Sequence, residues 1–425
     1  MPNSPTPEIR GDGEPTGIDD IDLTRSELYR HGFPHGTFAF LRREAPVWWH
    51  PLPPNFSGND DAGVWVLSRY DDIQAANRDS QLFSAFEGPA LGHNPEMHGA
   101  MLVSMDGREH TRQRRIISAG FTPRMVGRLE ERARRWSESI VGEALERGRC
   151  DFVYDVAYRL PMHMIADIMG IPLEDRDWLF QVTNDFLLAS DSENVLTRED
   201  QVAKQVEMFQ YAQELGQRKR KDPGDDIWTI LSAAAVDTGE SDQSTLSEME
   251  LNLFFLLLTV AGSETTRNAI TLGLVALLDH PDQLEDLRNG KAEMKAAVEE
   301  IIRWSSPVGY FCRRATRDTE IRGVRIAAGE RISLWYASGN RDEDVFADPF
   351  RFDIRRSPNH HVAFGGGGPH FCLGANLARF EIAILFEELL RRARAIEVLE
   401  PLSYSVLGIY NPILLAPKAL PIRLA

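Results

Sequence analysis

The segment FGGGGPHFCLG, residues 364–374, is the most distinctive part of this chain. It places Cys372 just before a predicted helix over residues 375–392, in which apolar side chains recur at helical spacing. The free amides and positive end of a helix N-terminus stabilise the thiolate form of such a cysteine. The four preceding glycines let the backbone pass close beneath a bulky planar group. A thiolate in this position can ligate iron.

Other functions of this loop differ in the spacing they require. A phosphate-binding loop needs Gly-Lys-Ser/Thr after the glycines, and Pro369-His370 stands there instead. The dinucleotide fingerprint also fails, because its last glycine position falls on His370 or Phe371. A zinc site around Cys372, a cysteine nucleophile with His370 as its base, and an inert buried cysteine all stay open. The zinc site would recruit His360, His361 and His370.

A second unusual segment lies inside a long helix predicted over residues 246–279. Ser247 and Glu250 match a capping box at its start, and His280-Pro281 ends it. Its apolar run gives way to AGSETT, residues 261–266, where the glycine weakens the helix by roughly 1 kcal/mol relative to alanine. Glu264 must be paired, solvated or protonated if this part is buried. The segment therefore either lets a flat ligand approach the backbone or forms a kink whose glutamate faces solvent.

The remaining pattern is mostly helical with a minor β region. A strand is predicted at residues 64–67, and a hairpin over 319–336 with its turn at Ala328-Gly329-Glu330. No linker or repeat divides the sequence, so we expect one domain over residues 21–425 after a disordered leader, residues 1–20. Further helices are predicted over residues 125–145, 160–169, 201–220 and 294–304.

Composition and charge exclude several classes of protein. With 43% hydrophobic and 26% charged residues, the 425-residue chain is not disordered as a whole. Its 64 acidic and 47 basic residues give a net charge of −17, which opposes wholesale binding to nucleic acid or anionic membrane. Three cysteines without CxxC spacing argue against a disulfide scaffold or a zinc finger. Neither a signal peptide nor an apolar run of membrane length is apparent, so we expect a cytoplasmic protein.

Three segments in this order resemble the cytochrome P-450 family of haem-thiolate monooxygenases. They are AGSET at residues 261–265, EIIR at 300–303, and the cysteine loop with its continuation GANLAR at 374–379. The resemblance runs from about Ile21 to the C-terminus. It implies a single-domain cytochrome P-450 fold, mainly α with a minor β region. The implied cofactor is haem b (iron protoporphyrin IX), with O2 as co-substrate.

The resemblance also implies roles for individual residues. Cys372 becomes the axial ligand of the haem iron, since a thiolate donates electron density that favours O–O cleavage. Glu264 and Thr265 match the acid–alcohol pair with which the family delivers protons to oxygen. A structural triad that supports the cysteine loop corresponds to Glu300, Arg303 and Arg356, whereas the spacing alone is equally typical of a surface ion pair.

Haem carries two propionates, so cationic or N–H-donating partners are expected. The resemblance implies His110, Arg114, Arg313 and His370 for this role. It further implies that the haem contacts small or loop residues, namely Ala261, Gly262, Phe364, Gly365 and Gly374.

The loop is one residue longer between Phe364 and Cys372 than is usual in the family. This form resembles the bacterial subgroup that oxidises terminal methyl groups of branched-chain lipids, isoprenoids and sterol side chains. The substrate-facing residues that the family implies are mainly apolar, which suits a lipophilic substrate. They are Met101, Leu102, Val103, Phe186, Val308, Phe311 and Ile413.

The activity implied is hydroxylation of an unactivated C–H bond in a terpenoid, branched lipid, steroid or polyketide-like molecule. Electrons would come from NAD(P)H through a ferredoxin reductase and a ferredoxin, because the chain has no flavin or iron–sulfur motif. Alternatives are a hydrogen-peroxide-driven peroxygenase and a non-catalytic haem-binding sensor. A cluster of arginines is either a solvated helix face or a docking patch for an acidic ferredoxin. It consists of Arg112, Arg114, Arg115, Arg124 and Arg128.

Overall fold

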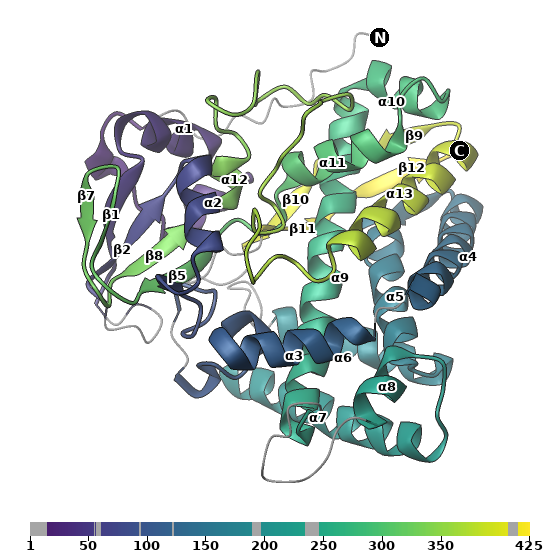
Figure 1. Ribbon diagram of the computed structural model, residues 1–425. Helices are drawn as coiled ribbons and strands as arrows, with labels where there is room; N and C mark the ends of the chain where they lie inside the picture. Colours follow the sequence, from purple (N-terminus) through teal and green to yellow (C-terminus); the bar gives the residue numbers. More distant parts are fainter. Residues whose placement is uncertain are drawn as a thin grey trace. The chain divides into compact units, whose positions relative to one another are not determined.

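The structure, a computed structural model, describes most of the chain in two compact units. Figure 1 shows their helices and strands, and the part described is mainly helical with a smaller β part, as predicted. The first unit comprises Met1–Pro95, Asn268–Cys372 and Pro401–Leu420, and the second comprises Glu96–Arg267, Leu373–Glu400 and Pro421–Ala425. The residues described are 15–54, 56, 61–92, 95–120, 123–188, 197–233, 246–406 and 415–425.

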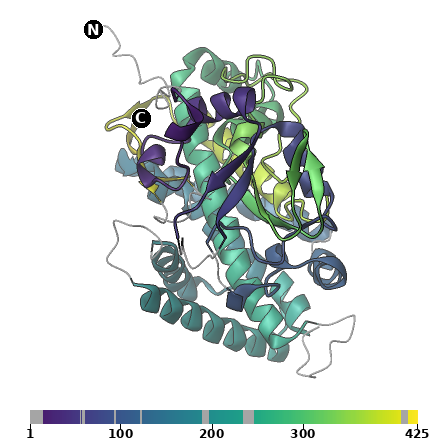
Figure 2. The ribbon, with the colours of Figure 1, turned by 90° about the vertical axis from the view of Figure 1, so that its left-hand side faces the viewer.

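The first unit contains a mixed sheet of order β1-β2-β8-β5-β3. Alternation along β2 directs Val64 and Val66 into one apolar cluster and Trp65 and Leu67 into another. Residues of helix α1 belong to the first cluster and residues of α2 to the second. Figure 2 shows the purple strands β1 and β2 beside green strands from much later in the chain. The strands are β1 (Val47–Pro51), β2 (Gly63–Leu67), β3 (Phe83–Ser84), β5 (Phe311–Ala315) and β8 (Arg331–Leu334).

Helices and short strand pairs complete the described part of this unit. The helices are α1 (His35–Glu44), α2 (Tyr70–Arg78), α10 (Pro281–Arg288), α11 (Met294–Ser305) and α12 (Tyr336–Gly339). The antiparallel pairs are β6 (Thr319–Ile321) with β7 (Val324–Ile326), and β10 (Ser403–Val406) with β11 (Leu415–Ala419).

The hairpin predicted over residues 319–336 is wrong in its pairing. β6 and β7 pair with each other through Arg322 and Gly323, whose φ angles of 52° and 79° suit a tight two-residue turn. β8 does not join this hairpin but pairs with β5 and β2. Gly329 therefore redirects the chain from one sheet to the other and does not close a hairpin.

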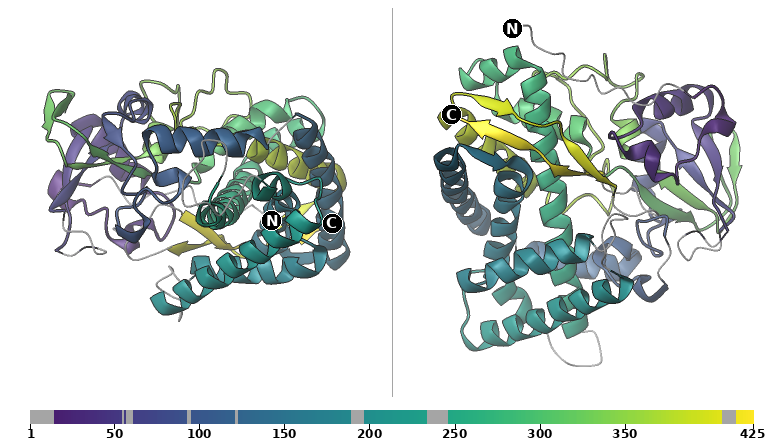
Figure 3. Two further views of the ribbon diagram at one scale, coloured as in Figure 1. Left: turned by 60° about the horizontal axis from the view of Figure 1, so that its bottom comes forward. Right: turned by 180° about the vertical axis from the view of Figure 1, so that it is seen from behind.

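The second unit is helical with a small sheet of order β4-β12-β9. Helix α4 packs along α13 and α5, and α5 is buried on all sides, as its apolar sequence requires. Helices α6 and α7 run side by side (Figure 3). The elements are α3 (Gly107–Ala119), α4 (Pro123–Arg147), β4 (Arg149–Asp151), α5 (Arg159–Met169), α6 (Arg176–Leu188), α7 (Arg198–Lys221), α8 (Ile227–Ala233), α13 (Ala375–Arg392), β9 (Ile396–Val398) and β12 (Pro421–Leu424).

Helix α9 (Glu248–Asp279) contributes residues to both units. Its predicted capping box is present, because the amide of Glu250 donates to Oγ of Ser247 (3.1 Å) and the amide of Ser247 donates to Oε2 of Glu250 (2.7 Å). The other predicted helices also begin and end within three residues of the observed bounds. Local periodicity and capping were therefore sufficient to locate them.

The predicted leader lies mostly outside the described residues. Ile18–Asp20 forms a 3-10 turn, and Ile18 packs against an apolar cluster, so these three residues are ordered. Within the part of the chain that the structure describes, no helix is both long and apolar enough to cross a membrane.

Candidate functional site

The cysteine loop is shaped by four successive glycines in the left-handed region. Residues 365–368 have φ angles of 95°, 65°, 110° and 81°, which residues with a Cβ atom rarely adopt. The loop also rests on the last turn of α2, since a Cβ on Gly368 would lie 2.2 Å from the carbonyl oxygen of Asn77. A Cβ on Gly367 would lie 3.1 Å from Nε of Arg78. Backbone conformation and contact with α2 thus explain these glycines, without the planar ligand that the sequence suggested.

Cys372 differs from the other two cysteines in its exposure. Cys312 is buried, Cys150 is half-buried, and Cys372 is exposed. Burial raises the pKa of Cys312 and of Cys150 to about 11, so both are neutral thiols near pH 7. Cys372 precedes α13 by three residues and is therefore the cysteine best suited to supply a thiolate. Its exposure contradicts the alternative of an inert buried cysteine.

The loop closes on itself through its backbone and two aromatic rings. The amide of Cys372 donates to the carbonyl oxygen of Phe364 at 3.0 Å, and the amide of Phe371 donates to that of Gly368 at 3.2 Å. The rings of Phe364 and Phe371 meet edge to face with their centroids 6.3 Å apart. Phe364 is therefore one of the residues that hold the backbone of Cys372 in place.

The zinc alternative finds no support in the described part of the chain, where no three His, Cys, Asp or Glu side chains are arranged to hold a metal ion. Nε2 of His361 instead lies 3.0 Å from Oε2 of Glu299. The backbone carbonyl of His360 accepts a hydrogen bond from the hydroxyl of Tyr70 at 2.6 Å.

Glu300 and Arg303 form the ion pair that their spacing predicts. Nε of Arg303 lies 2.7 Å from Oε2 of Glu300, and Nη2 lies 2.8 Å from Oε1. Both side chains are 0% exposed, which excludes the alternative of a solvated surface pair. Nε of Arg356 approaches Oε2 of Glu300 at 3.2 Å, so the predicted third member joins the pair.

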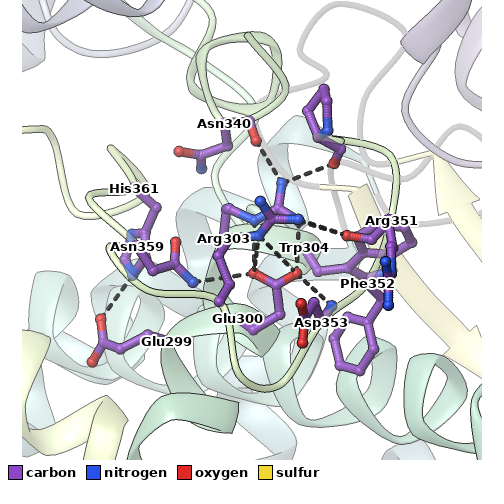
Figure 4. A network of polar contacts seen from close by, with 12 residues as sticks. Glu299, Glu300, Arg303, Trp304, Asn340, Arg351, Phe352, Asp353, Asn359 and His361 are labelled. Carbon is purple, nitrogen blue, oxygen red and sulfur yellow. Dashed lines mark hydrogen bonds and ion pairs between the residues drawn. The ribbon is translucent and has the colours of Figure 1, made fainter. Parts of the chain in front are cut away.

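This network extends into the chain that leads to the cysteine loop (Figure 4). Arg303 donates through Nη1 to the carbonyl oxygen of Asn340 at 2.8 Å. Glu300 accepts from the amide of Asp353 at 2.9 Å and from Nδ2 of Asn359 at 3.1 Å. The last three residues were not predicted from the sequence, because partners this far apart in the chain leave no local pattern.

Helix α9 stays helical through residues 261–266, and its polar side chains have separate partners. Glu264 is 1% exposed and pairs with Arg267 one turn later, so the alternative of a solvent-facing glutamate is wrong. Burial raises the pKa of Glu264, and Arg267 opposes that shift. The hydroxyl of Thr265 donates to the carbonyl oxygen of Ala261 at 2.9 Å. The three-residue spacing was a signal that could have revealed Arg267.

Gly262 has a packing reason for lacking a side chain. A Cβ at this position would lie 2.4 Å from Cδ1 of Ile165 on α5. Close contact between α9 and α5 therefore requires the glycine, and a haem contact for Gly262 stays a prediction.

The predicted propionate partners fall in different units. His110 and Arg114 belong to the second unit, where His110 is 3% exposed, and Arg313 and His370 belong to the first. Arg313 is 4% exposed and donates to the carbonyl oxygen of Cys312 at 2.7 Å. Its Nη2 also donates to Oδ1 of a buried asparagine on α2 at 3.3 Å, so neighbours in the first unit already orient it.

The predicted arginine cluster is only partly available for docking. Arg112 is 8% exposed and pairs with two glutamates, and Arg128 pairs with an aspartate at 2.6 Å. The charges of these two arginines are therefore already paired within the second unit. Arg115 is exposed and Arg114 is half-buried, whereas the side chain of Arg124 lies outside the described residues.

The predicted substrate-facing residues are also divided between the units. Met101, Leu102 and Val103 lie at a 3-10 turn of the second unit, and Phe186 lies on α6. In the first unit, Val308 and Phe311 are half-buried and pack against an apolar cluster of the sheet. Ile413 lies outside the described residues.

Comparison with known proteins gives a consistent result. A family model described as Cytochrome P450 matches residues 61–397. Steroid C26-monooxygenase of Rhodococcus jostii (strain RHA1) is 43% identical over 381 residues, which cover 88% of this chain and 79% of that protein. Methyl-branched lipid omega-hydroxylase of Mycobacterium bovis is 43% identical over 369 residues, or 84% of each chain. The structure of cytochrome P450 CYP268A2 of Mycobacterium marinum with pseudoionone matches with a TM-score of 0.83 at 37% identity, and covers 92% of this chain and 94% of that one.

Proposed function

The chain belongs to the cytochrome P450 family of monooxygenases, and we propose that it hydroxylates an unactivated C–H bond of a lipophilic small molecule. The observation that carries this proposal is the exposed Cys372 at the end of the glycine loop. Its backbone is held by Phe364, and the other two cysteines are neutral thiols.

The donor set fits the haem that the family implies. An exposed cysteine just before a helix N-terminus can supply the thiolate that a ferric iron ligand requires, so Cys372 is the residue that would ligate the haem iron. Haem, when bound, supplies O2 activation, which a thiolate ligand assists. The guanidinium and imidazole groups proposed to hold the propionates can donate hydrogen bonds to carboxylates. They are His110, Arg114, Arg313 and His370.

Glu264 and Thr265 are the proposed proton-handling residues. A carboxyl whose pKa is raised by burial keeps its proton to higher pH, as a proton donor requires. The hydroxyl oxygen of Thr265 can accept a hydrogen bond while its proton is donated to Ala261. This pair favours a monooxygenase over a peroxide-fed enzyme, which has less need of proton delivery.

The proposed substrate is a steroid with a branched side chain or a methyl-branched lipid, oxidised at a terminal methyl group. Two relatives with 43% identity are named for steroid C26 and for the omega position of a methyl-branched lipid. The longer cysteine loop supports the same subgroup, and the apolar character of residues such as Leu102 and Val308 suits such a substrate.

We further propose that electrons reach the enzyme from NAD(P)H through a separate ferredoxin reductase and ferredoxin. This sequence carries no flavin or iron–sulfur motif, which supports a donor on a separate protein. A cytoplasmic location stays a prediction.

The first experiment is the carbon monoxide difference spectrum of the dithionite-reduced protein. We expect a strongly red-shifted Soret band, the mark of thiolate ligation. Cys372→His should still bind haem but lose that band, whereas Cys150→Ser, the control, should keep it. An unchanged band in the Cys372→His protein would eliminate Cys372 as the ligand.

The second experiment tests the substrate with a branched-side-chain sterol, a methyl-branched fatty acid and, as control, a straight-chain fatty acid. With ferredoxin, reductase and NADPH, mass spectrometry should detect one added oxygen at the terminal carbon of the branched substrates. Equal turnover with hydrogen peroxide alone would favour the peroxygenase alternative. Haem binding without turnover under either condition would favour a sensor.

A further inference from the structure

Two neighbouring glutamates on α11 hold the chain that enters the cysteine loop. Oε2 of Glu300 accepts from Nδ2 of Asn359 at 3.1 Å, and Oε2 of Glu299 lies 3.0 Å from Nε2 of His361. Figure 4 shows His361 and Asn359 turned toward these two carboxylates. The contact of Glu299 is therefore additional to the Glu300 ion-pair network.

His361 connects this contact to the cysteine backbone. Its side chain is 2% exposed, and its ring centroid lies 5.7 Å from that of Phe364. Phe364 accepts the amide hydrogen of Cys372 through its carbonyl oxygen and meets the ring of Phe371 edge to face. One hydrogen bond and one ring contact thus separate Glu299 from the residue whose backbone positions the cysteine.

A hydrogen bond between His361 and Glu299 can hold the imidazole ring of His361 in one orientation. An ionised carboxylate only accepts hydrogen bonds, so with Glu299 ionised the contact requires the tautomer of His361 that carries a proton on Nε2. That bond defines the ring's tautomer and plane. In a close-packed surrounding, a ring held in one plane restricts the ring that packs on it, here Phe364.

We propose that His361 and Glu299 form a positioning pair for the thiolate ligand. The pair holds Phe364, and the hydrogen bond from the amide of Cys372 to the carbonyl oxygen of Phe364 then holds the backbone that carries Sγ. Neither residue contacts the reacting atoms. The inference rests on the proposed haem-thiolate function.

The test compares holoproteins carrying His361→Phe, Glu299→Ala or Glu299→Gln. Phenylalanine keeps a ring against Phe364 but cannot donate to Glu299, and alanine removes the acceptor. Both should raise the ratio of non-thiolate to thiolate carbon monoxide complex about tenfold, the effect of losing one buried hydrogen bond. Glutamine retains an accepting oxygen and should stay near wild type. The ferric–ferrous midpoint potential should shift in the two impaired variants.

His50→Phe is the matched control. His50 is another buried histidine of the first unit, 2% exposed, with Nε2 accepting from the amide of Leu23 at 2.9 Å and lying 3.5 Å from Asp22. This variant should lower the unfolding midpoint and leave the thiolate share and the midpoint potential unchanged.

Several outcomes would overturn the positioning role. They are a wild-type thiolate share in His361→Phe and Glu299→Ala, an equal loss in His50→Phe, and a Glu299→Gln protein as impaired as Glu299→Ala. If His361→Phe fails to fold, the two Glu299 variants decide, because the side chain of Glu299 is 23% exposed and its replacement leaves no fully buried cavity. Absence of the thiolate band from the wild-type protein would overturn the proposed function together with this inference. A thiolate band in the wild-type protein that is unchanged in the variants would overturn the positioning role alone.

Discussion

Two buried glutamates show how a charged partner changes the behaviour of a carboxyl group. Glu264 and Glu381 are each 1% exposed. Arg267 opposes the rise that burial produces in the pKa of Glu264. The pKa of Glu381 is raised well above its usual value by burial alone, and its Oε2 has no hydrogen-bond partner among the described residues. The two carboxyls therefore differ in that Glu264 has a charged partner, whereas burial of Glu381 is opposed by no cation.

Glu381→Gln should therefore change how stability depends on pH. The folded protein retains the Glu381 proton at pH values where the unfolded chain has released it, so this residue's contribution falls as pH rises above the ordinary glutamate pKa of about 4.3. Glutamine resembles the protonated acid, so the urea midpoint of the variant should decline less between acidic and neutral pH. The exposed Glu44 supplies the control, as Glu44→Gln. Parallel pH curves for wild type and Glu381→Gln would contradict the assignment.

Thr265→Ala should separate electron consumption from product formation. Without the hydroxyl, NAD(P)H oxidation should continue while product per NAD(P)H falls about tenfold or more, the usual scale of lost proton-transfer assistance. Thr259→Ala is a matched control, since Thr259 also lies on α9 and donates to the carbonyl oxygen four residues before it, at 2.7 Å. The readouts are product and hydrogen peroxide per NAD(P)H. Unaltered coupling in Thr265→Ala would remove Thr265 from proton handling.

Some glycines lie where two secondary-structure elements are in close contact. Gly262 allows α9 to pack on Ile165 of α5, and Gly368 allows the cysteine loop to rest on Asn77 of α2. Other glycines are needed for their dihedral angles. Gly365 has a φ of 95°, yet a Cβ there would come no closer than 3.7 Å to the carbonyl oxygen of the nearby His370. Substitution by alanine can distinguish a glycine required for close packing from one required for its positive φ angle.

Gly262→Ala should destabilise the protein by about 1–3 kcal/mol through overpacking. Ile165→Val removes Cδ1, the atom nearest to the new methyl group, and alone should cost about 0.5–1.5 kcal/mol. In the double variant, the loss in the free energy of unfolding should be about 1 kcal/mol smaller than the sum of the two single losses, as measured by urea unfolding. Additive losses would mean that α5 packing does not require the glycine.

Gly368→Ala should impair the cysteine loop more than Gly365→Ala. Each alanine is strained by its positive φ, at roughly 1–2 kcal/mol, but only the first also meets the rigid backbone oxygen of Asn77 at 2.2 Å. Haem content and the thiolate share of the carbon monoxide complex measure the difference. Equal impairment would show that conformation, and not contact with α2, dominates.

Across the whole molecule, many basic side chains are engaged by the excess of acidic ones. The net charge is −17, and three of the four basic residues in the last turn of α7 pair with an acidic side chain. An acidic electron donor would need a local cationic site, and among the described side chains of the predicted cluster Arg115 is exposed. The paired residues of α7 are Arg218, Lys219 and Arg220.

Arg115→Glu should slow reduction by a ferredoxin about tenfold at low ionic strength, because steering of an acidic donor is lost. Raising the salt concentration should reduce the gap between variant and wild type. Arg43→Glu changes another surface arginine and should have little effect, and chemical reduction by dithionite should be the same in all three proteins. Equal ferredoxin rates in Arg115→Glu and wild type would exclude this docking role.

Local pattern was sufficient for the capping box of α9, for the Glu300–Arg303 pair and for Cys372 as the chemically distinctive cysteine. It also located helices α4, α5, α7, α9, α11 and α13, whereas α1, α2, α3, α6, α8 and α10 were not predicted. Each of these depends on residues within a few positions of one another, where spacing and backbone preference decide the outcome. Tertiary structure decided the pairing of β8 with β2, the packing reason for Gly262, and the contact of Glu299 with His361, 62 residues away. Packing selects such distant partners after the elements have formed, so no local pattern in the chain specifies them.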